Sequence, residues 1–174
     1  TILRFELQDI NWSKNDLFLH SEAFSRSAIK NCIETDKRLL LWMDNKHISE
    51  NTAALLGSFK AGLKVLSVQQ KLSEIDQQNP RILKSYIEEQ QPNLMIVSPN
   101  QKIGLSSKIE ILYNAYPELK DKTHTSLKPI ISLPNLKYIL HTGYYHKNGL
   151  TKFRDFLVYP TKNYTVDNLL KFEN

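Results

Sequence analysis

Cysteine and long apolar segments are almost absent from this sequence, and each shortage excludes a class of protein. Cys32 is the single cysteine of the chain, so no internal disulfide can form. Its neighbours Ile29 and Ile33 indicate a small core residue rather than a reactive thiol. No apolar run approaches the roughly 18 residues of a membrane span, so we predict no transmembrane segment in the chain itself.

Glycine is also scarce, and this excludes the common phosphate-binding loops. The five glycines are never clustered; they stand at Gly57, Gly62, Gly104, Gly143 and Gly149. Neither a P-loop nor a Gly-x-Gly-x-x-Gly motif can be built from them. A serine nucleophile elbow of the Gly-x-Ser-x-Gly type is missing too, so the sequence does not support a hydrolase.

Two histidines in the last third of the chain were considered as metal ligands. His141 and His146 are five positions apart, which places them together on neither a helix face nor a strand face. We therefore predict no metal site there. Since His141 lies at the end of an expected strand, we expect its ring to be hydrogen bonded to nearby backbone.

Composition indicates one folded domain with a mildly basic surface. The 174 residues are 41% hydrophobic and 24% charged, with a net charge of +5. A lysine-rich solvated surface accounts for this charge, and we regard nucleic acid as an unlikely partner. A mild basic excess is common in the mitochondrial matrix, and Thr1 is not an ordinary start. Either a removed leader or a preceding disordered segment explains this start, and a mitochondrial transit peptide is one explanation among several. We expect a location in the matrix or on the matrix side of the inner membrane.

The stretch from Arg38 to Gln69 predicts a strand, a helix and a second strand. Residues 39–43 are a short continuous apolar run, typical of a strand buried on both faces of a parallel sheet. Gly62 predicts a left-handed helix cap, and residues 64–68 form the second strand. The helix between them repeats at the spacing of one apolar face: Ile48, Thr52, Leu55, Leu56 and Phe59. A βαβ unit of this length places its two strands parallel.

The same alternation continues along the chain. A capping box of Ser13 and Asp16 opens a helix to about residue 31, and Asn79 followed by Pro80 opens another to about residue 90. Further strands are expected at 94–97 and 137–142, and further helices at 105–116, 152–157 and 166–172. We predict an α/β fold, a Rossmann-like parallel sheet of about four or five strands flanked by helices. Its divisions are an N-terminal arm or edge strand at 1–12, the α/β domain at 13–159 and a tail with a short helix at 160–174.

Two segments of the chain resemble the adenylate-forming superfamily, the acyl-CoA synthetases and their relatives. The phrase at residues 55–62, LLGSFKAG, is similar to the end of that family's first crossover helix. LPNLKYILHTG at 133–143, followed by FRDFL at 153–157, is similar to the segment that precedes the family's phosphate-binding loop. The resemblance covers about residues 11–159 and implies the fold of the N-terminal subdomain of acyl-CoA synthetases.

The resemblance implies a fold without the family's active site. Adenylate formation uses a Gly/Ser/Thr-rich loop ending in lysine, an acidic Mg²⁺ ligand and a later lysine. No such loop occurs before Asn174, so we predict no catalytic, cofactor-binding or metal residues and no cofactor. The chain is then expected to be a pseudoenzyme, not an enzyme, with no small-molecule substrate.

Three functions are considered on this basis. The first is an accessory subunit that binds other proteins in a large assembly, such as a respiratory complex or ATP synthase of the mitochondrial inner membrane. The second is the N-terminal fragment of an active ATP-dependent acyl-CoA ligase, whose missing loop would lie beyond Asn174. The third is an RNA-associated protein, for instance an accessory subunit of the ribosome.

A basic and aromatic group is the candidate interface. It consists of Tyr144, Tyr145, Lys147, Lys152 and Arg154. Tyrosine and arginine are enriched at protein interfaces, and the same residues can stack on RNA bases. A solvated loop, a protein interface and a nucleic-acid site therefore stay open as interpretations of this group.

Overall fold

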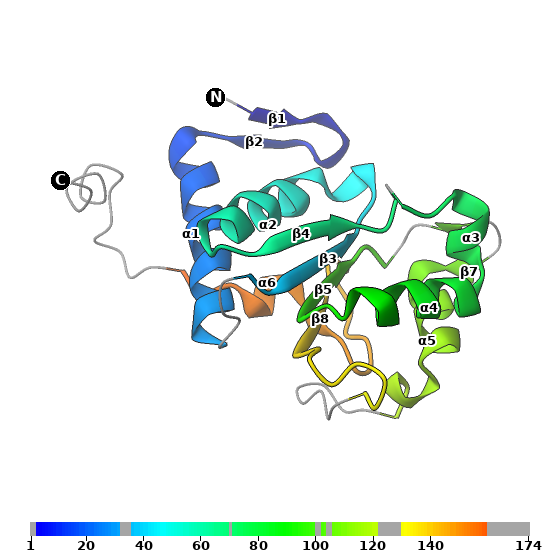
Figure 1. Ribbon diagram of the computed structural model, residues 1–174. Coiled ribbons are helices and arrows are strands. Elements are labelled where there is room, and N and C mark those ends of the chain that lie inside the picture. The colour runs from blue at the N-terminus through cyan, green and yellow to red at the C-terminus, as the bar shows by residue number, and fades with distance from the viewer. Residues whose placement is uncertain are drawn as a thin grey trace.

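A parallel five-stranded sheet forms the centre of the molecule, with helices on both faces (Figure 1). The computed structural model describes residues 3–31, 36–69, 71–99, 102–103, 106–121 and 130–159. The strands lie in the order β4-β3-β5-β8-β9, and every neighbouring pair is parallel. They are β3 (Arg38–Trp42), β4 (Lys64–Ser67), β5 (Leu94–Val97), β8 (Tyr138–His141) and β9 (Thr151–Lys152). The predicted fold class is confirmed.

Alternate residues of the central strands enter two separate cores. In β3, Leu39 and Leu41 face one core, while Leu40 and Trp42 face the other. All four side chains are buried, because the strand is covered on both faces. The continuous apolar run at 39–43 predicted this arrangement.

The first face is covered by α1 (Lys14–Lys30), α2 (Ile48–Lys60) and α6 (Phe153–Phe156). Two short strands, β1 (Leu3–Phe5) and β2 (Ile10–Trp12), form an antiparallel hairpin around the 3-10 turn η1 (Glu6–Gln8). Phe5 and Trp12 of this hairpin join the same core. The predicted arm is thus a hairpin that packs on this face.

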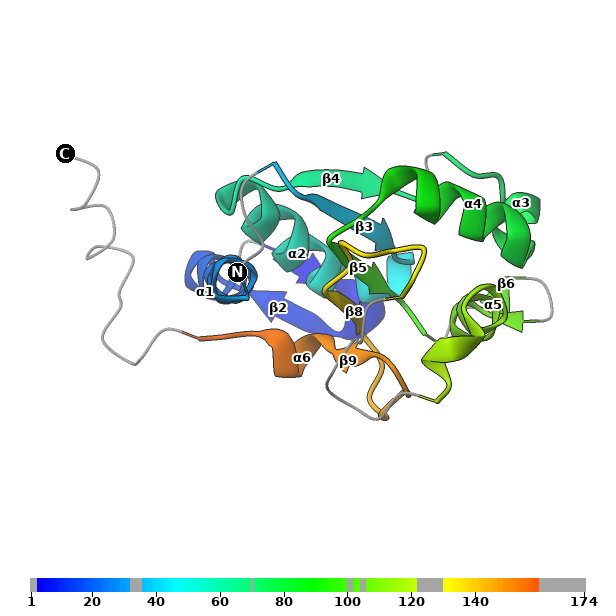
Figure 2. The ribbon, with the colours of Figure 1, turned by 60° about the horizontal axis from the view of Figure 1, so that its bottom comes forward.

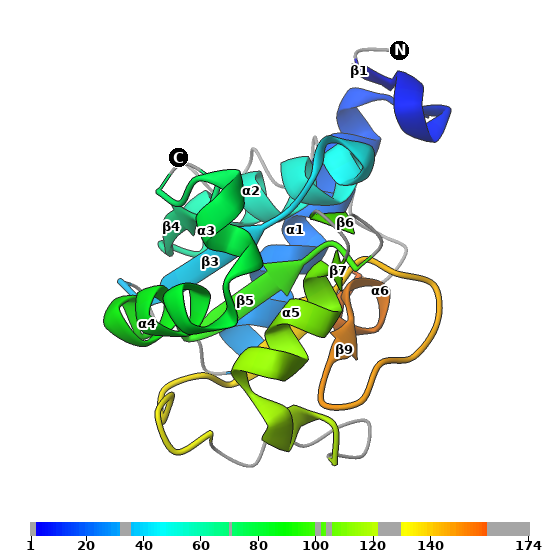
Figure 3. The same cartoon turned by 90° about the vertical axis from the view of Figure 1, so that its right-hand side faces the viewer.

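The second face is covered by α4 (Pro80–Gln90) and α5 (Lys108–Ala115), which lie across the sheet from α1 and α2 (Figure 2). Figure 3 looks onto this face, with α3 (Glu74–Gln78) beside α4. The remaining elements are η2 (Asn45–His47), β6 (Lys102–Ile103), β7 (Ser106–Ser107) and η3 (Pro117–Leu119). We predicted no helix in the stretch that contains α3, although Ser73 caps it by accepting a hydrogen bond from the Asp76 N–H.

Local capping signals are confirmed at three helix ends. The Ser13 hydroxyl oxygen accepts a hydrogen bond from the Asp16 N–H, and the Asp16 carboxylate accepts one from the Ser13 N–H. The Asn79 side chain caps α4 ahead of Pro80. Gly62 follows α2 with a φ of 71°, the left-handed conformation that glycine adopts without strain.

The orientation of α2 differs from the predicted one. Of its expected apolar face, Ile48, Leu56 and Phe59 are exposed. The buried face is instead made of small residues: Ser49, Ala53, Ala54, Gly57 and Ser58. They let α1 approach so closely that a Cβ on Gly57 would lie 2.5 Å from the Ser21 carbonyl oxygen. Close packing of two helices therefore decides which face of α2 is buried.

Some predictions concern residues outside the described part of the chain. These are Cys32 and the tail at 160–174 with its short helix. Within the part that is described, no helix combines the length and the apolar character needed to cross a membrane.

Candidate functional site

The strand order reverses between β3 and β5, and polar groups gather where these strands end. From β3 the chain crosses to β4 on one side, and from β4 it returns to β5 on the other side of β3. Ligands of doubly wound sheets bind at the carboxyl ends of the strands next to such a point. Asp44 follows β3 and Ser98 follows β5, and both are buried.

A buried lysine, Lys108, lies at this point of the fold. It is the first residue of α5, and its Nζ lies 3.3 Å from the Trp42 carbonyl oxygen and 3.4 Å from the Ser98 hydroxyl. Burial lowers its pKa to about 8, against the opposing effect of Asp44. Because its amine donates hydrogen bonds to groups of the protein itself, Lys108 connects α5 to the ends of β3 and β5 and is not directed at a ligand.

His141 occupies the same edge at the end of β8, and our expectation for it is wrong. Its ring is fully buried, and neither ring nitrogen is hydrogen bonded to any residue that the structure describes. Burial lowers its pKa to about 4, and the cations of Lys147 and Lys152 act in the same direction.

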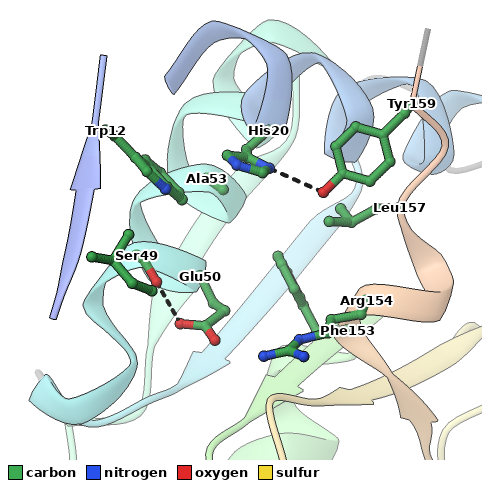
Figure 4. Close-up of a pocket in the computed structure, with 10 residues that line it drawn as sticks. Trp12, His20, Ser49, Glu50, Ala53, Phe153, Arg154, Leu157 and Tyr159 are labelled. Carbon is green, nitrogen blue, oxygen red and sulfur yellow. Dashed lines mark hydrogen bonds between the residues drawn. The ribbon is translucent and has the colours of Figure 1, made fainter. Parts of the chain in front are cut away.

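A pocket opens beside this edge, on the face of α1 and α2 (Figure 4). Its volume is about 160 Å³. Four segments line it: the N-terminal hairpin, α1, the start of α2, and α6 with the residues after it. The lining residues are Ile10, Trp12, His20, Ser49, Glu50, Ala53, Phe153, Arg154, Leu157 and Tyr159.

One wall of the pocket is aromatic. The ring of His20 stacks on Trp12 with centroids 4.6 Å apart, and its Nδ1 lies 3.0 Å from the Tyr159 hydroxyl. Burial lowers the pKa of His20, while Asp16 opposes this effect. Through its contacts with Trp12 and Tyr159, the His20 ring connects the hairpin, α1 and the residues after α6 in this wall.

The second wall carries a carboxylate that stays ionised. Glu50 Oε2 accepts hydrogen bonds of 2.8 Å from Gln8 Nε2 and from the Ser49 hydroxyl. Its Oε1 lies 3.8 Å from His47 Nδ1. Burial acts to raise the pKa of Glu50, but the hydrogen bonds from His47, Gln8 and Ser49 and from its own backbone outweigh burial and lower it to about 2. The carboxylate therefore also fastens the hairpin to α2.

The structure separates the residues of the candidate interface. Tyr144 and Tyr145 are exposed and contact each other edge to face, with centroids 5.5 Å apart. Lys152 Nζ lies 6.0 Å from the Tyr144 ring centroid, so these three residues form one group. Lys147 is half-buried in a turn, and Arg154 lines the pocket instead.

Sequence reasoning missed Lys108 and Glu50, although one of them left a signal. Lys108 shares a helix face with Leu112 and Ala115, which are buried, and a lysine on such a face is unusual. Glu50 gave none, because its partner Gln8 is 42 positions away in the chain. Only the packing of the hairpin on α2 brings the two together.

Comparison with known proteins identifies the fold through solved structures alone. No family model matches the chain, and no curated protein matches it in sequence. A protein described as a long-chain-fatty-acid CoA ligase from Rhodopseudomonas palustris matches with a TM-score of 0.61 and 13% identity, over 86% of this chain and 30% of that one. Coronafacic acid ligase from Pectobacterium brasiliense matches with a TM-score of 0.59 and 15% identity, over 90% of this chain and 26% of that one.

Acetoacetyl-CoA synthetase from Streptomyces lividans gives a similar match. Its TM-score is 0.61 at 10% identity, over 92% of this chain and 22% of that one. At such identities the likeness shows the fold, and the chain spans less than a third of each matched structure. The resemblance to the N-terminal portion of acyl-CoA ligases is confirmed at that level.

These matches correct the expectation that the chain is not an enzyme. Each of the three matched structures is that of a ligase or synthetase. The fold is therefore one that these enzymes share, and the absence of a phosphate loop within these 174 residues was too little to infer a pseudoenzyme.

Proposed function

We propose that this chain is the N-terminal α/β unit of an enzyme that activates a carboxylic acid with ATP. The observation that carries the proposal is the likeness of nearly the whole chain to part of three ligases, with TM-scores of 0.59 to 0.61. The parallel sheet, with its strand order reversing between β3 and β5, supports it further.

The residues of this chain do not themselves fit a nucleotide. Its glycines are not clustered, and the buried lysine at the carboxyl edge donates to the Trp42 carbonyl and the Ser98 hydroxyl. We derive no step of phosphate chemistry from them. In this proposal, phosphate and Mg²⁺ are held by sequence outside the chain, and this unit supplies the sheet on which that part packs.

The test is carboxylate-dependent ATP–pyrophosphate exchange by the complete protein purified from its source. Mass spectrometry of the purified protein establishes which peptides accompany this chain. We expect exchange with some member of a panel of fatty, aromatic and amino acids, and loss of the exchange after depletion with an antibody against this chain. Exchange that stays in solution after depletion would belong to another protein and would contradict the proposal.

Membership of a large assembly and a mitochondrial location are proposals that rest on the sequence alone. The group of the exposed Tyr144 and Tyr145 with the half-buried Lys152 is the surface that we offer for a partner subunit. Gradient fractionation of the source organelle with mass spectrometry tests both. Migration with one set of protein subunits supports the assembly, whereas migration with ribosomal RNA, lost in high salt, supports the RNA-associated alternative.

A further inference from the structure

Two opposite charges border the pocket beside the carboxyl edge. The Glu50 carboxylate lies on the α2 wall, and the Arg154 guanidinium extends from α6 toward that wall (Figure 4). Among the described residues, no carboxylate forms an ion pair with Arg154. Gln8 and Ser49 hold the Glu50 carboxylate in place. The pocket therefore presents a fixed anion, and the Arg154 guanidinium has N–H donors that a ligand can use.

The rest of the lining is apolar or aromatic and sets the size of a ligand. Trp12 and Tyr159 line it with aromatic rings, and Phe153 and Leu157 add apolar surface. A volume of about 160 Å³ holds one small ring or a short branched chain, since a cavity of roughly 150 Å³ is known to take benzene. Aromatic faces next to a carboxylate also attract an organic ammonium group.

We propose that this pocket binds a small zwitterion of the amino-acid type. The ammonium group lies against Glu50 and the ring of Trp12, the carboxylate pairs with Arg154, and a short apolar side chain packs on Phe153. The inference goes beyond the proposed function, because binding of this ligand requires neither ATP nor activation of its carboxylate.

Calorimetry with the full-length protein that contains this chain tests the proposal with three matched probes. Leucine carries both charges, 4-methylpentanoate lacks the amine, and isopentylamine lacks the carboxylate. We expect leucine to bind at least about tenfold more tightly than either analogue, because each analogue leaves one charged group of the pocket without its partner.

Two variants separate the roles of the charges. Arg154→Gln should weaken leucine and 4-methylpentanoate roughly tenfold and leave isopentylamine unchanged, since charge-assisted hydrogen bonds to the carboxylate are lost. Glu50→Gln should weaken leucine and isopentylamine instead. Lys152→Gln is the matched control, because it makes the same change of charge just outside the pocket, and it should alter none of the three affinities.

Several outcomes would overturn the proposal. Failure of all three probes to bind is one, equal affinities for leucine and 4-methylpentanoate are another, and unchanged leucine binding by Arg154→Gln is a third. If Glu50→Gln does not fold, Arg154→Gln decides alone, because Arg154 has no ionic partner among the described residues to lose. Leucine binding without any ATP–pyrophosphate exchange would contradict the proposed function and leave this pocket's ligand established.

Discussion

The carboxyl edge of the sheet and the neighbouring pocket both gather charged groups, but they hold them in opposite ways. At the edge, Lys108 and His141 are enclosed, and burial lowers both pKa values, to about 8 and about 4. In the pocket, hydrogen bonds lower the pKa of Glu50 to about 2, so its charge is fixed. Lys108 can thus lose its proton at mildly alkaline pH and His141 gains one only at acid pH, whereas Glu50 in the pocket stays ionised between these limits.

The different causes of these pKa shifts suggest different roles for the two regions, one in stability and one in binding. A buried group whose charged form is disfavoured makes the free energy of unfolding depend on pH. A carboxylate that is hydrogen bonded and ionised at every ordinary pH instead provides a constant field for a ligand. We therefore expect the edge to control how stability changes with pH above about pH 4 and the pocket to control recognition.

Lys108→Met should give the largest effect. Because the pKa of Lys108 is about 8 in the fold and 10.5 in the unfolded chain, the unfolded state holds the proton more tightly, and stability rises as pH increases from 8 to 10.5. The variant should lack this rise, which is worth roughly 3 kcal/mol. Urea unfolding of both proteins at several alkaline pH values measures it. Lys71→Met is the control, because Lys71 is exposed. If the free energy of unfolding changed equally with pH in all three proteins, Lys108 would not be desolvated.

His141→Leu comes next and acts on the acid side. The pKa of His141 is about 4 in the fold against 6.5 in the unfolded chain, so its contribution to stability is complete above pH 6.5 and is lost as pH falls toward 4. The wild type should lose roughly 3 kcal/mol more than the variant over this range. Denaturant titrations at pH 7, 5.5 and 4 measure the difference. Parallel losses in the two proteins would mean that the ring finds a partner when protonated.

Local signals in the sequence predicted the frame on which both regions are built. The run at 39–43, the cap of Asn79 with Pro80 and the left-handed Gly62 each depend on neighbours in the chain alone. Their outcome could therefore be deduced without knowing the fold. The parallel sheet followed from their order.

The face of α2 and the pocket depend on contacts between distant segments, and the sequence could not supply them. Phe59 is exposed because α1 packs on the opposite side of α2, at Gly57. The sequence of α2 alone does not indicate which of its sides α1 contacts. Arg154 was grouped with Tyr144 by proximity in the chain, yet it borders a pocket with Trp12, far away in sequence. Apolar periodicity indicates that a helix has two faces but does not decide which one a small-residue contact will bury.

Glu50→Gln tests the fixed charge of the pocket with a smaller effect on stability. The pKa of Glu50 is about 2 in the fold against 4.5 in the unfolded chain, so its contribution is present above pH 4.5 and is lost as pH falls toward 2. Since the side chain is partly exposed, we expect a loss of roughly 1 kcal/mol at pH 7 in the variant. The variant should still show the loss of stability between pH 6.5 and 4 that is due to His141. A variant that no longer showed this loss would indicate that edge and pocket are coupled.

Arg154→Gln should change stability least, and this is what makes it the clearest test of the comparison. The side chain is exposed and has no ionic partner among the described residues, so the free energy of unfolding should change by less than about 0.5 kcal/mol. Thermal unfolding with and without leucine measures both properties at once. Without ligand, the two proteins should melt together. With leucine in excess, the wild type should gain about 1.4 kcal/mol more stability than the variant, because stabilisation by a ligand grows with the logarithm of its concentration relative to Kd and the variant binds about tenfold more weakly. A large loss of stability without ligand would instead assign Arg154 to the fold, and the pocket would then resemble the edge, with its charges serving the structure alone.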